Sequence, residues 1–482
     1  MKLRFSLVLS LLLAGFGLRA QTLISTTLLG SKTKAQLTTQ FNLPFIQYGA
    51  KFYRITYTSP GVNGALDTVS GLVAVPNDLT KVYPRLVYQH GTSSSKLDVP
   101  SYNATQANGE GSIGLLFAGL GYVALLPDYL GLGVSDGFHP YVHAASEASV
   151  ALDMLRALPA FNSQNGVHTN SQLFMTGYSQ GGHASMALHR AVETDPAAEF
   201  SATAATHLSG PYSIGEVMRG LILSDSVYYF PAYLPNTILS YQTAYGNLFN
   251  QVSDIFKAPY AAKIDAFYKG TLALGQLNNE LISLLITNVG DSRPLRMLQD
   301  SVVQAVESDP QHPFNVALRA NNVYAWAPKV PTRIFYCKAD DQVPYQNSVL
   351  ARDSMLARGA ASLAAQDVNT NADHGDCVNP ALTNTLLFFA GYQQVSTFVD
   401  TDEPAIQILS LTPNPASQFV QLPYLDNAGE WQVYAVSGRL IQSEQLPAGE
   451  QQWDVSRLEN GLYFVQFKAK GTVWQGKLVV QH

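Results

Sequence analysis

Near the start of the chain, hydrophobic and polar residues alternate at strand spacing. In Lys51–Thr58 the side chains of Tyr53, Ile55 and Tyr57 fall on one face, and Thr68–Val75 repeats the alternation after a turn rich in Gly, Pro and Asn. A period of two residues is typical of a half-buried β-strand. The two segments therefore predict a β-hairpin.

After this hairpin, short apolar runs alternate with segments of helical periodicity. The predicted strands are Arg85–Gly91, Gly121–Tyr129, Gln172–Gly177, Ser201–Leu208, Thr332–Tyr336 and Gln366–Thr370. The predicted helices are Ile113–Leu120, Ala144–Leu158, Ser179–His189, Tyr345–Arg358 and Pro380–Tyr392. Alternation of strands and helices is typical of a largely parallel sheet that carries helices on both faces.

Between residues 211 and 328 the pattern changes to helix-like segments broken by prolines. Four aromatic residues, Tyr228, Tyr229, Phe230 and Tyr233, lie close together there. Strand character returns only at Thr332. We expect these residues to form a helical cap over the sheet.

Beyond Asp400–Pro404 the sequence contains only strand and turn patterns. Runs such as WQVYAVSGRLIQSEQL and NGLYFVQFKA are short and are separated by Gly, Pro and Asn. This spacing predicts a small all-β sandwich of about 75 residues. We therefore expect one domain over residues 21–403, with the cap at about 211–328, and a second domain over residues 404–482.

The first twenty residues have the pattern of a secretory signal peptide. Lys2 and Arg4 precede an apolar centre from Leu7 to Phe16, and Ala20 is a small residue at the expected cleavage position. The apolar centre is too short for a membrane span. The sequence therefore predicts an exported, soluble protein.

Composition narrows the possible partners. Of the 482 residues, 46% are hydrophobic and only 13% are charged, and the formal net charge is −6. No basic stripe is present, so a nucleic acid is not expected as a partner.

The segment Gln172–His189 predicts a nucleophile. An apolar strand runs into Gly177-Tyr-Ser179-Gln-Gly181, and good helix formers follow. A strand-to-helix turn this tight strains the backbone of the central serine and requires glycine on both sides. The helix that begins there points its free N–H groups at the site of a developing oxyanion.

A serine nucleophile needs a histidine that takes its proton and a carboxylate that orients the histidine. In α/β-hydrolases these residues follow in the order Ser, Asp or Glu, His. Of the ten histidines only His374 and His482 lie beyond the predicted cap, and His482 is the last residue of another domain. His374 is therefore the predicted base. The acid should follow the strand before it, and the residues alone leave Asp340 and Asp341 equally open.

The oxyanion hole needs two backbone N–H groups. The expected donors are Gln180, which follows the nucleophile, and Thr92, which follows a glycine after the strand Arg85–Gly91. His90 in the same loop is expected to pack in its turn. Asp128 and Tyr129 end a neighbouring strand and are expected to be structural.

Five motifs over residues 50–395 together resemble the α/β-hydrolase secretory lipase and esterase family. They are HGT ending at Thr92, PDYLGLGVSDGFHPY from Pro127, GYSQGG from Gly177, DDQVPY from Asp340 and DHGDC from Asp373. The resemblance implies an α/β-hydrolase fold, and the ester chemistry expected of this chain needs no metal or cofactor. In that family the acid stands four residues before the proline of D-x-x-V-P, which implies Asp340 rather than Asp341.

The tail resembles the C-terminal sorting domain of type IX secretion substrates. The resemblance rests on LTPNPAS from Leu411, SGRLI from Ser437, LENGLYFVQF from Leu458 and KLVV near the end. It implies a Gram-negative host, outer-membrane secretion machinery as a partner, and release or attachment at the cell surface.

The sequence thus predicts a secreted serine hydrolase that cleaves carboxylic esters, a lipase or carboxylesterase. Ser179 is the expected nucleophile of an acyl-enzyme mechanism, with His374 and Asp340 as its partners. A serine peptidase on the same fold and a non-catalytic surface-binding protein remain alternatives.

Cys337 and Cys377, the only two cysteines, are expected to form a disulfide. Cys337 lies three residues before Asp340, and Cys377 lies three residues after His374. A triad that joins Asp340 to His374 brings the thiols together, and an exported protein meets an oxidising environment. The alternative is a pair of buried free thiols.

Overall fold

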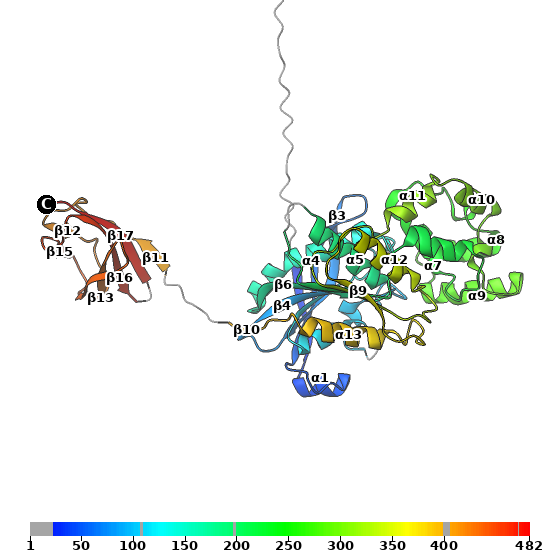
Figure 1. Cartoon of the computed structure of the whole chain (residues 1–482), viewed down its shortest axis with the longest axis horizontal. Coiled ribbons are helices and arrows are strands. Elements are labelled where there is room, and N and C mark those ends of the chain that lie inside the picture. The colour runs from blue at the N-terminus through cyan, green and yellow to red at the C-terminus, as the bar shows by residue number, and fades with distance from the viewer. Residues whose placement is uncertain (1–22, 107–108, 196–198, 399–404, 471) are drawn as a thin grey trace, which may run out of the picture. The chain divides into compact units, whose positions relative to one another are not determined.

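The computed structural model describes residues 23–106, 109–195, 199–398, 405–470 and 472–482. These residues form two units, and the division falls after Phe398 (Figure 1). The predicted signal peptide, residues 1–20, and the predicted domain boundary near Pro404 lie outside the described residues.

A mixed sheet with strand order β1-β2-β3-β5-β4-β6-β7-β8-β9 forms the centre of the first unit. In this order, each strand from β1 to β5 pairs antiparallel with the next one. From β5 to β9 each strand pairs parallel with the next one. The short β10 pairs antiparallel with β4. The strands are β1 Leu23–Lys32, β2 Ala50–Pro60, β3 Leu66–Pro76, β4 Lys81–Gln89, β5 Val123–Pro127, β6 His168–Gly177, β7 Ala204–Leu208, β8 Thr332–Tyr336, β9 Leu363–Asp367 and β10 Ser396–Thr397.

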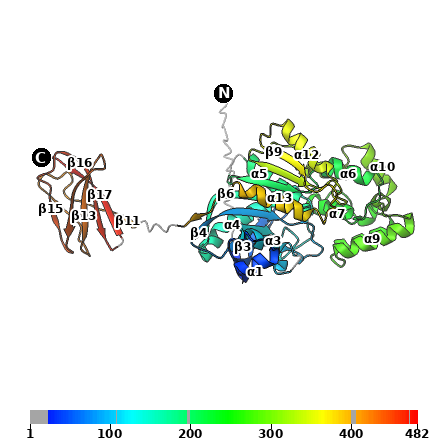
Figure 2. The ribbon, with the colours of Figure 1, turned by 60° about the horizontal axis from the view of Figure 1, so that its bottom comes forward.

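Helices cover both faces of this sheet because its strands are apolar on both sides. Leu72 and Ala74 of β3 pack in one core with α1, α3 and α13, whereas Val73 and Val75 pack in another with α4 and α5. Figure 2 turns the first of these faces toward the viewer. The helices are α1 Lys34–Phe41, α2 Pro100–Asn103, α3 Gly111–Gly119, α4 Ala144–Asn165, α5 Gln180–Thr194, α12 Gln346–Ala357 and α13 Val378–Ala390. The expected α/β-hydrolase architecture is confirmed.

Helical segments also fill residues 214–320, between β7 and β8. Helices α7 to α11 gather at one end of the unit in Figure 1. They share a hydrophobic cluster of their own, with Leu239, Leu277 and Leu281 fully buried. The segments are the π-helix η1 Ile214–Met218, α6 Arg219–Leu223, α7 Tyr233–Tyr245, the 3₁₀ turn η2 Val252–Asp254, α8 Ala258–Tyr268, α9 Leu274–Val289, the 3₁₀ turn η3 Pro294–Met297, α10 Asp300–Ser308 and α11 Pro313–Ala320.

The second unit is built from strands. Its main sheet has the order β11-β17-β16-β13-β14, and β12 pairs with β15. Trp431, Val433 and Val465 lie in its core. The strands are β11 Ala405–Ile408, β12 Phe419–Gln421, β13 Gly429–Ala435, β14 Leu440–Leu446, β15 Gln452–Asp454, β16 Gly461–Ala469 and β17 Thr472–Val480. Over the described ranges of both units, the helices are too short or too polar to span a bilayer.

The parallel strands place the predicted site residues at one edge of the sheet. Thr92 follows β4, Ser179 follows β6, Asp340 follows β8 and His374 follows β9. Because the carboxyl ends of parallel strands share an edge, residues distant in sequence meet there. Strand β9 begins three residues earlier than the predicted segment Gln366–Thr370 and overlaps it.

Candidate active site

Ser179 sits on a strained turn between β6 and α5. Its backbone angles are φ 59° and ψ −122°, outside the regions that residues with a Cβ prefer. Its N–H donates to the carbonyl of Leu208 at 3.0 Å. A Cβ on Gly181 would collide with the carbonyl of Gln89, and one on Gly177 would collide with the carbonyl of Gly181. The two glycines therefore make this turn sterically possible.

Asp340 and His374 are joined directly. His374 Nδ1 lies 2.7 Å from Asp340 Oδ2, and the Asp340 side chain is only 1% exposed. The other oxygen of Asp340 accepts the N–H groups of Gln342 and Val343 at 3.0 and 2.8 Å. Asp341 is exposed and accepts the backbone N–H of His374 at 3.2 Å. Only Asp340 is thus placed to orient the imidazole.

Tyr178, the residue before Ser179, links the serine turn to His374. Its hydroxyl donates to the backbone carbonyl of His374 at 2.5 Å, and the two rings lie 5.0 Å apart. In the described part of the chain, Ser179 Oγ and His374 Nε2 have no hydrogen-bond partner. The structure therefore does not join the serine to the histidine by a direct hydrogen bond, and such hydrogen bonds often form fully only when substrate is bound.

The two expected oxyanion donors belong to Gln180, which follows the serine, and to Thr92, which follows Gly91. The Cα of Gly91 is close to the elbow, since a Cβ built on it would lie 3.6 Å from the carbonyl oxygen of Tyr178. Among the described residues the backbone N–H groups of Thr92 and Gln180 have no acceptor. Gln180 is also the first residue of α5, so the positive end of that helix points to the same place. This geometry can hold a negatively charged oxygen.

An apolar cavity of about 110 Å³ extends from Ser179 among the cap helices. Tyr141, Tyr233 and Gln342 lie in its wall together with Ser179. Burial raises the pKa of Tyr233 to about 12, so this hydroxyl stays neutral at physiological pH. The apolar wall is formed by Ile214, Met218, Ile222, Leu223, Leu234, Ile238, Leu298, Val302, Val306, Phe314 and Leu318.

Residues 104–382, more than half of the chain, match the sequence model of the secretory lipases. The chain belongs to the secretory lipase family. Residues 410–481 match the secretion system C-terminal sorting domain. A search of curated proteins finds no significant match.

Solved structures agree with this family membership. The rice cell wall degrading esterase LipA of Xanthomonas oryzae is 27% identical, with a TM-score of 0.67 over 77% of this chain and 96% of that chain. A Legionella pneumophila protein assigned as a hydrolase is 25% identical, with a TM-score of 0.68 over 77% and 98%. Lipase A of Candida antarctica, at 16% identity and a TM-score of 0.57 over 78% and 83%, shares the fold.

This secretory lipase is an ester hydrolase that is secreted or held at the cell surface. The prediction of an enzyme acting on esters is confirmed, and so is the resemblance of the tail to the type IX sorting domain. The family finding also decides against the non-catalytic alternative.

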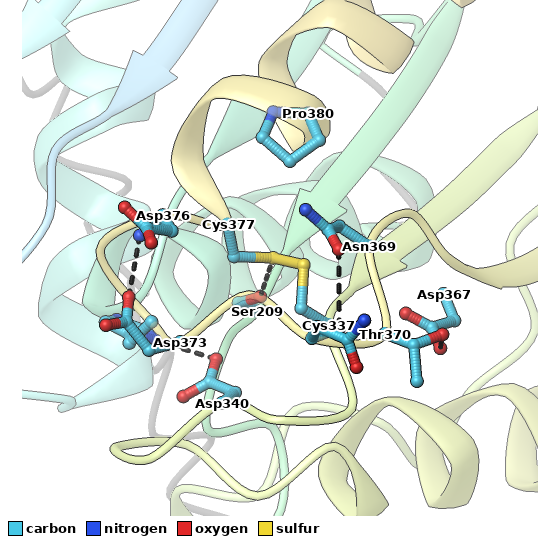
Figure 3. The surroundings of a disulfide bond; sticks show 12 residues. Ser209, Cys337, Asp340, Asp367, Asn369, Thr370, Asp373, Asp376, Cys377 and Pro380 are labelled. Carbon is cyan, nitrogen blue, oxygen red and sulfur yellow. Dashed lines mark hydrogen bonds and ion pairs between the residues drawn. A yellow bond between two sulfur atoms is a disulfide. The ribbon is translucent and has the colours of Figure 1, made fainter.

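The predicted disulfide is present in the secretory lipase unit. Cys337 and Cys377 are bonded, with Cα atoms 6.0 Å apart, and both are fully buried. Figure 3 shows the bond between the loop that continues to Asp340 and the loop that contains Asp373 and Asp376. The covalent link therefore spans the two loops that supply Asp340 and His374.

Three polar residues next to the site were not singled out from the sequence. Glu110 contacts the loop before Thr92, and Glu147 and His139 contact the side chain of Gln180. No motif joins these residues, because they lie on separate segments that only the fold brings together. The one available signal is the long PDYLGLGVSDGFHPY motif, which contains His139.

His90, Asp128 and Tyr129 support the same loop. The hydroxyl of Tyr129 donates to the carbonyl of His90 at 2.9 Å, and the two rings stack 4.2 Å apart. Asp128 accepts the N–H and the hydroxyl of Ser101 and the hydroxyl of Ser70. These contacts hold the loop and the end of β5 in place. Among the residues described, no group of three or more His, Cys, Asp or Glu is arranged to hold a metal ion.

Proposed function

We propose that this secretory lipase cleaves carboxylic esters through a Ser179-His374-Asp340 triad and an acyl-enzyme. The observation that carries the proposal is the 2.7 Å contact between His374 Nδ1 and the buried Asp340 carboxylate, beside a serine on a strained elbow. A serine, a histidine and a carboxylate in this order provide a nucleophile, a base and a group that orients the base.

In the acylation step Ser179 Oγ attacks the ester carbonyl, and its proton passes to His374 Nε2. Asp340 accepts a hydrogen bond from the Nδ1–H of His374 and remains ionised, which fixes the tautomer and stabilises the imidazolium that forms. The carbonyl oxygen becomes an oxyanion and accepts the N–H groups of Thr92 and Gln180. When the C–O bond breaks, the leaving alkoxide takes the proton from His374 and departs as the alcohol.

Deacylation repeats these steps with water. His374 Nε2 removes a proton from water, and the hydroxide attacks the acyl carbonyl. The second tetrahedral intermediate releases Ser179, which regains its proton from His374, and the carboxylic acid departs. All groups return to their starting protonation states.

The cavity supports an ester with an apolar acyl group as the substrate. It begins at Ser179 and is lined mostly by aliphatic side chains of the cap. Burial of apolar surface contributes about 0.8 kcal/mol for each methylene.

The test is a panel of p-nitrophenyl esters of increasing chain length beside peptide anilides, assayed with wild type and Ser179→Ala. We expect ester turnover that falls by several orders of magnitude in Ser179→Ala. Ser185→Ala, on the same helix, is the matched control and should keep its activity. An acyl group trapped on Ser179 would support the intermediate. Full activity in Ser179→Ala would overturn the mechanism, and cleavage of anilides alone would favour a peptidase.

For the tail, we propose that residues 404–482 form a separate domain that engages the outer-membrane secretion machinery, while residues 21–403 form the hydrolase. The match of residues 410–481 to the sorting domain supports this division of roles. Each unit also has its own buried core.

A further inference from the structure

We infer that Glu110 and Glu147 are positioning residues for ester cleavage, because each carboxylate fixes the backbone that carries one of the two oxyanion donors. Glu110 acts on Thr92 through Gly91, and Glu147 acts on Gln180 through its side chain. The inference rests on the proposed function, since it assigns a role only if these donors stabilise an oxyanion.

Glu110 holds the loop that leads to Thr92. Its two carboxylate oxygens accept the N–H of Gly91 at 2.9 and 3.0 Å, and one of them also accepts the hydroxyl of Tyr88 at 2.8 Å. A Cβ on Gly91 would lie 2.8 Å from Oε1 of Glu110, so a larger residue would push the carboxylate out of this position. The peptide unit that carries the Thr92 N–H begins at Gly91, and the Glu110 carboxylate holds Gly91 in place.

Glu147 holds the side chain of Gln180. Its Oε1 accepts the amide of Gln180 at 2.9 Å, and its Oε2 lies 2.7 Å from Nδ1 of His183. All three residues are at most 1% exposed. His183 Nε2 in turn contacts the carbonyl of Asn321 at 2.8 Å. Gln180 is thereby attached to α4 and to the segment that directly follows α11.

His139 fixes which way the Gln180 amide faces. Its Nδ1 lies 2.8 Å from the carbonyl of Leu130 and donates to it, so its Nε2 accepts the second amide hydrogen of Gln180 at 2.8 Å. Burial lowers the pKa of His139 to about 4, which keeps the ring neutral and Nε2 free to accept. The amide nitrogen of Gln180 thus donates to two acceptors, Glu147 Oε1 and His139 Nε2.

This arrangement leaves one atom of Gln180 without a hydrogen bond, which lowers the stability of the folded protein. Gln180 Oε1 is buried and has no partner among the described residues. An unpaired buried acceptor destabilises the folded state. A side chain retained at that cost, directly beside the nucleophile, is understandable if it holds the Gln180 N–H in the direction of the oxyanion.

Positioning of this kind should affect the transition state more than substrate binding. Oxyanion donors act because they are aimed in advance, and loss of one donor lowers kcat by about 100- to 1,000-fold. Misaiming a donor that is still present should cost less. We expect a decrease of about 10- to 100-fold in kcat, with KM changed less than about twofold.

Glu193 offers a matched control because it is also a buried carboxylate that accepts backbone N–H groups. It accepts those of Lys329 and Val330 at 2.6 and 3.2 Å and is 8% exposed. It lies on the same helix as Gln180, about 20 Å further along. Its loss should cost stability without affecting the oxyanion hole.

The experiment compares Glu110→Leu, Glu147→Leu and Glu193→Leu with wild type in the full chain. Each variant is assayed for kcat, KM and thermal unfolding. Inhibition is measured with an alkyl trifluoromethyl ketone, which forms a tetrahedral oxyanion on Ser179, and with an alkyl ether of equal length, which does not. Glu110→Gln and Glu147→Gln keep acceptors at both positions and should recover most of the activity.

We expect the ketone to bind about 10- to 100-fold more weakly to Glu110→Leu and Glu147→Leu, while the ether binds equally to all proteins. Glu193→Leu should lose stability and keep its preference for the ketone. If the leucine variants do not fold, Glu110→Asp and Glu147→Asp withdraw the carboxylates by one methylene and serve the same comparison. If the folded variants of Glu110 or of Glu147 still prefer the ketone to the ether as strongly as wild type does, the positioning role of that carboxylate is overturned. An active Ser179→Ala would instead overturn the proposed function itself.

Discussion

At the residue scale, Ser179 shows how the local fold supports strain. A non-glycine residue in such a backbone conformation costs about 1–3 kcal/mol. The cost is offset by the hydrogen bond to Leu208, by the glycines on either side and by the packing of α5 on the sheet. In return the serine lines the cavity that the cap helices form.

The adjacent carboxylates Asp340 and Asp341 should differ sharply in their effect on activity. Asp340→Asn places an amide against His374 Nδ1 and favours the wrong tautomer, so kcat should fall by about 10⁴-fold. Asp341→Asn keeps an oxygen that can accept the His374 N–H, so kcat should change less than about threefold. Steady-state kinetics of both variants make the test, and the opposite ranking would reassign the acid.

Acid should weaken the fold through His139. Burial lowers its pKa in the folded protein to about 4, against the pull of Glu147, while the unfolded chain has the ordinary value of about 6.5. The unfolded state therefore binds the proton first as the pH falls. The contribution of this group to stability is complete above about pH 6.5 and is lost between about pH 6.5 and 4.

The measurement is the free energy of unfolding in urea at pH 7 and pH 4.5. We expect wild type to lose up to about 2.5 kcal/mol more than His139→Gln over this interval, because glutamine does not titrate. Equal losses in the two proteins would show that His139 does not carry the effect.

Chain order and turn chemistry are sufficient to select Ser179 and His374 as candidates. They are not sufficient to separate Asp340 from Asp341, because neighbours in a turn differ only in the direction of their side chains. Glu110 and Glu147 could not be found at all, since no spacing rule connects Glu110 to Gly91, 19 residues before it, or Glu147 to Gln180, 33 residues after it. Such pairs are defined by the fold alone.

At the element scale, the disulfide joins the loop after β8 to the loop before α13. Closing a loop of 40 residues is worth about 4 kcal/mol on the chain-entropy model. Cys337→Ala combined with Cys377→Ala should lower the free energy of unfolding by about this amount. It should also lower kcat at temperatures where the variant is fully folded, because Asp340 and His374 lose their shared tether.

Urea unfolding and kinetics at 15 °C separate these two effects. Each single variant serves as a comparison, since it removes the bond and leaves one thiol. Unchanged kcat with lowered stability would restrict the bond to a structural role. Unchanged stability would contradict the chain-entropy argument.

Elements with strong apolar periodicity could be predicted closely, whereas exposed elements could not. Strand β8 occupies Thr332–Tyr336 as expected, because it is almost completely buried. Strand β9 alternates half-buried and exposed residues at the sheet edge, so its pattern is weak and the prediction is displaced by three residues. The mostly exposed β1 and α1 were missed, although Thr33 and Gln36 form a capping box.

At the scale of the whole molecule, each of the two units has buried clusters of its own. The buried clusters of the sheet unit are built from residues between Leu37 and Phe389, and that of the tail from residues between Leu409 and Val480. Domains with their own cores can fold alone. The catalytic candidates all belong to the first unit.

A chain that ends at Phe398 should therefore fold and hydrolyse esters, with kcat/KM within about twofold of the full-length protein. The end at Phe398 matters because β10 pairs with β4, and Phe398 donates its N–H to Thr80 at 2.7 Å and stacks on His168. A chain that ends at Gln394 lacks these contacts and is the control, with lower thermal stability expected.

In a host with the secretion machinery the enzyme that ends at Phe398 should remain in the periplasm, since it lacks the sorting domain. Insoluble or inactive protein from the chain ending at Phe398 would show that the tail is part of the hydrolase fold, and normal export of that chain would show that the sorting signal lies elsewhere.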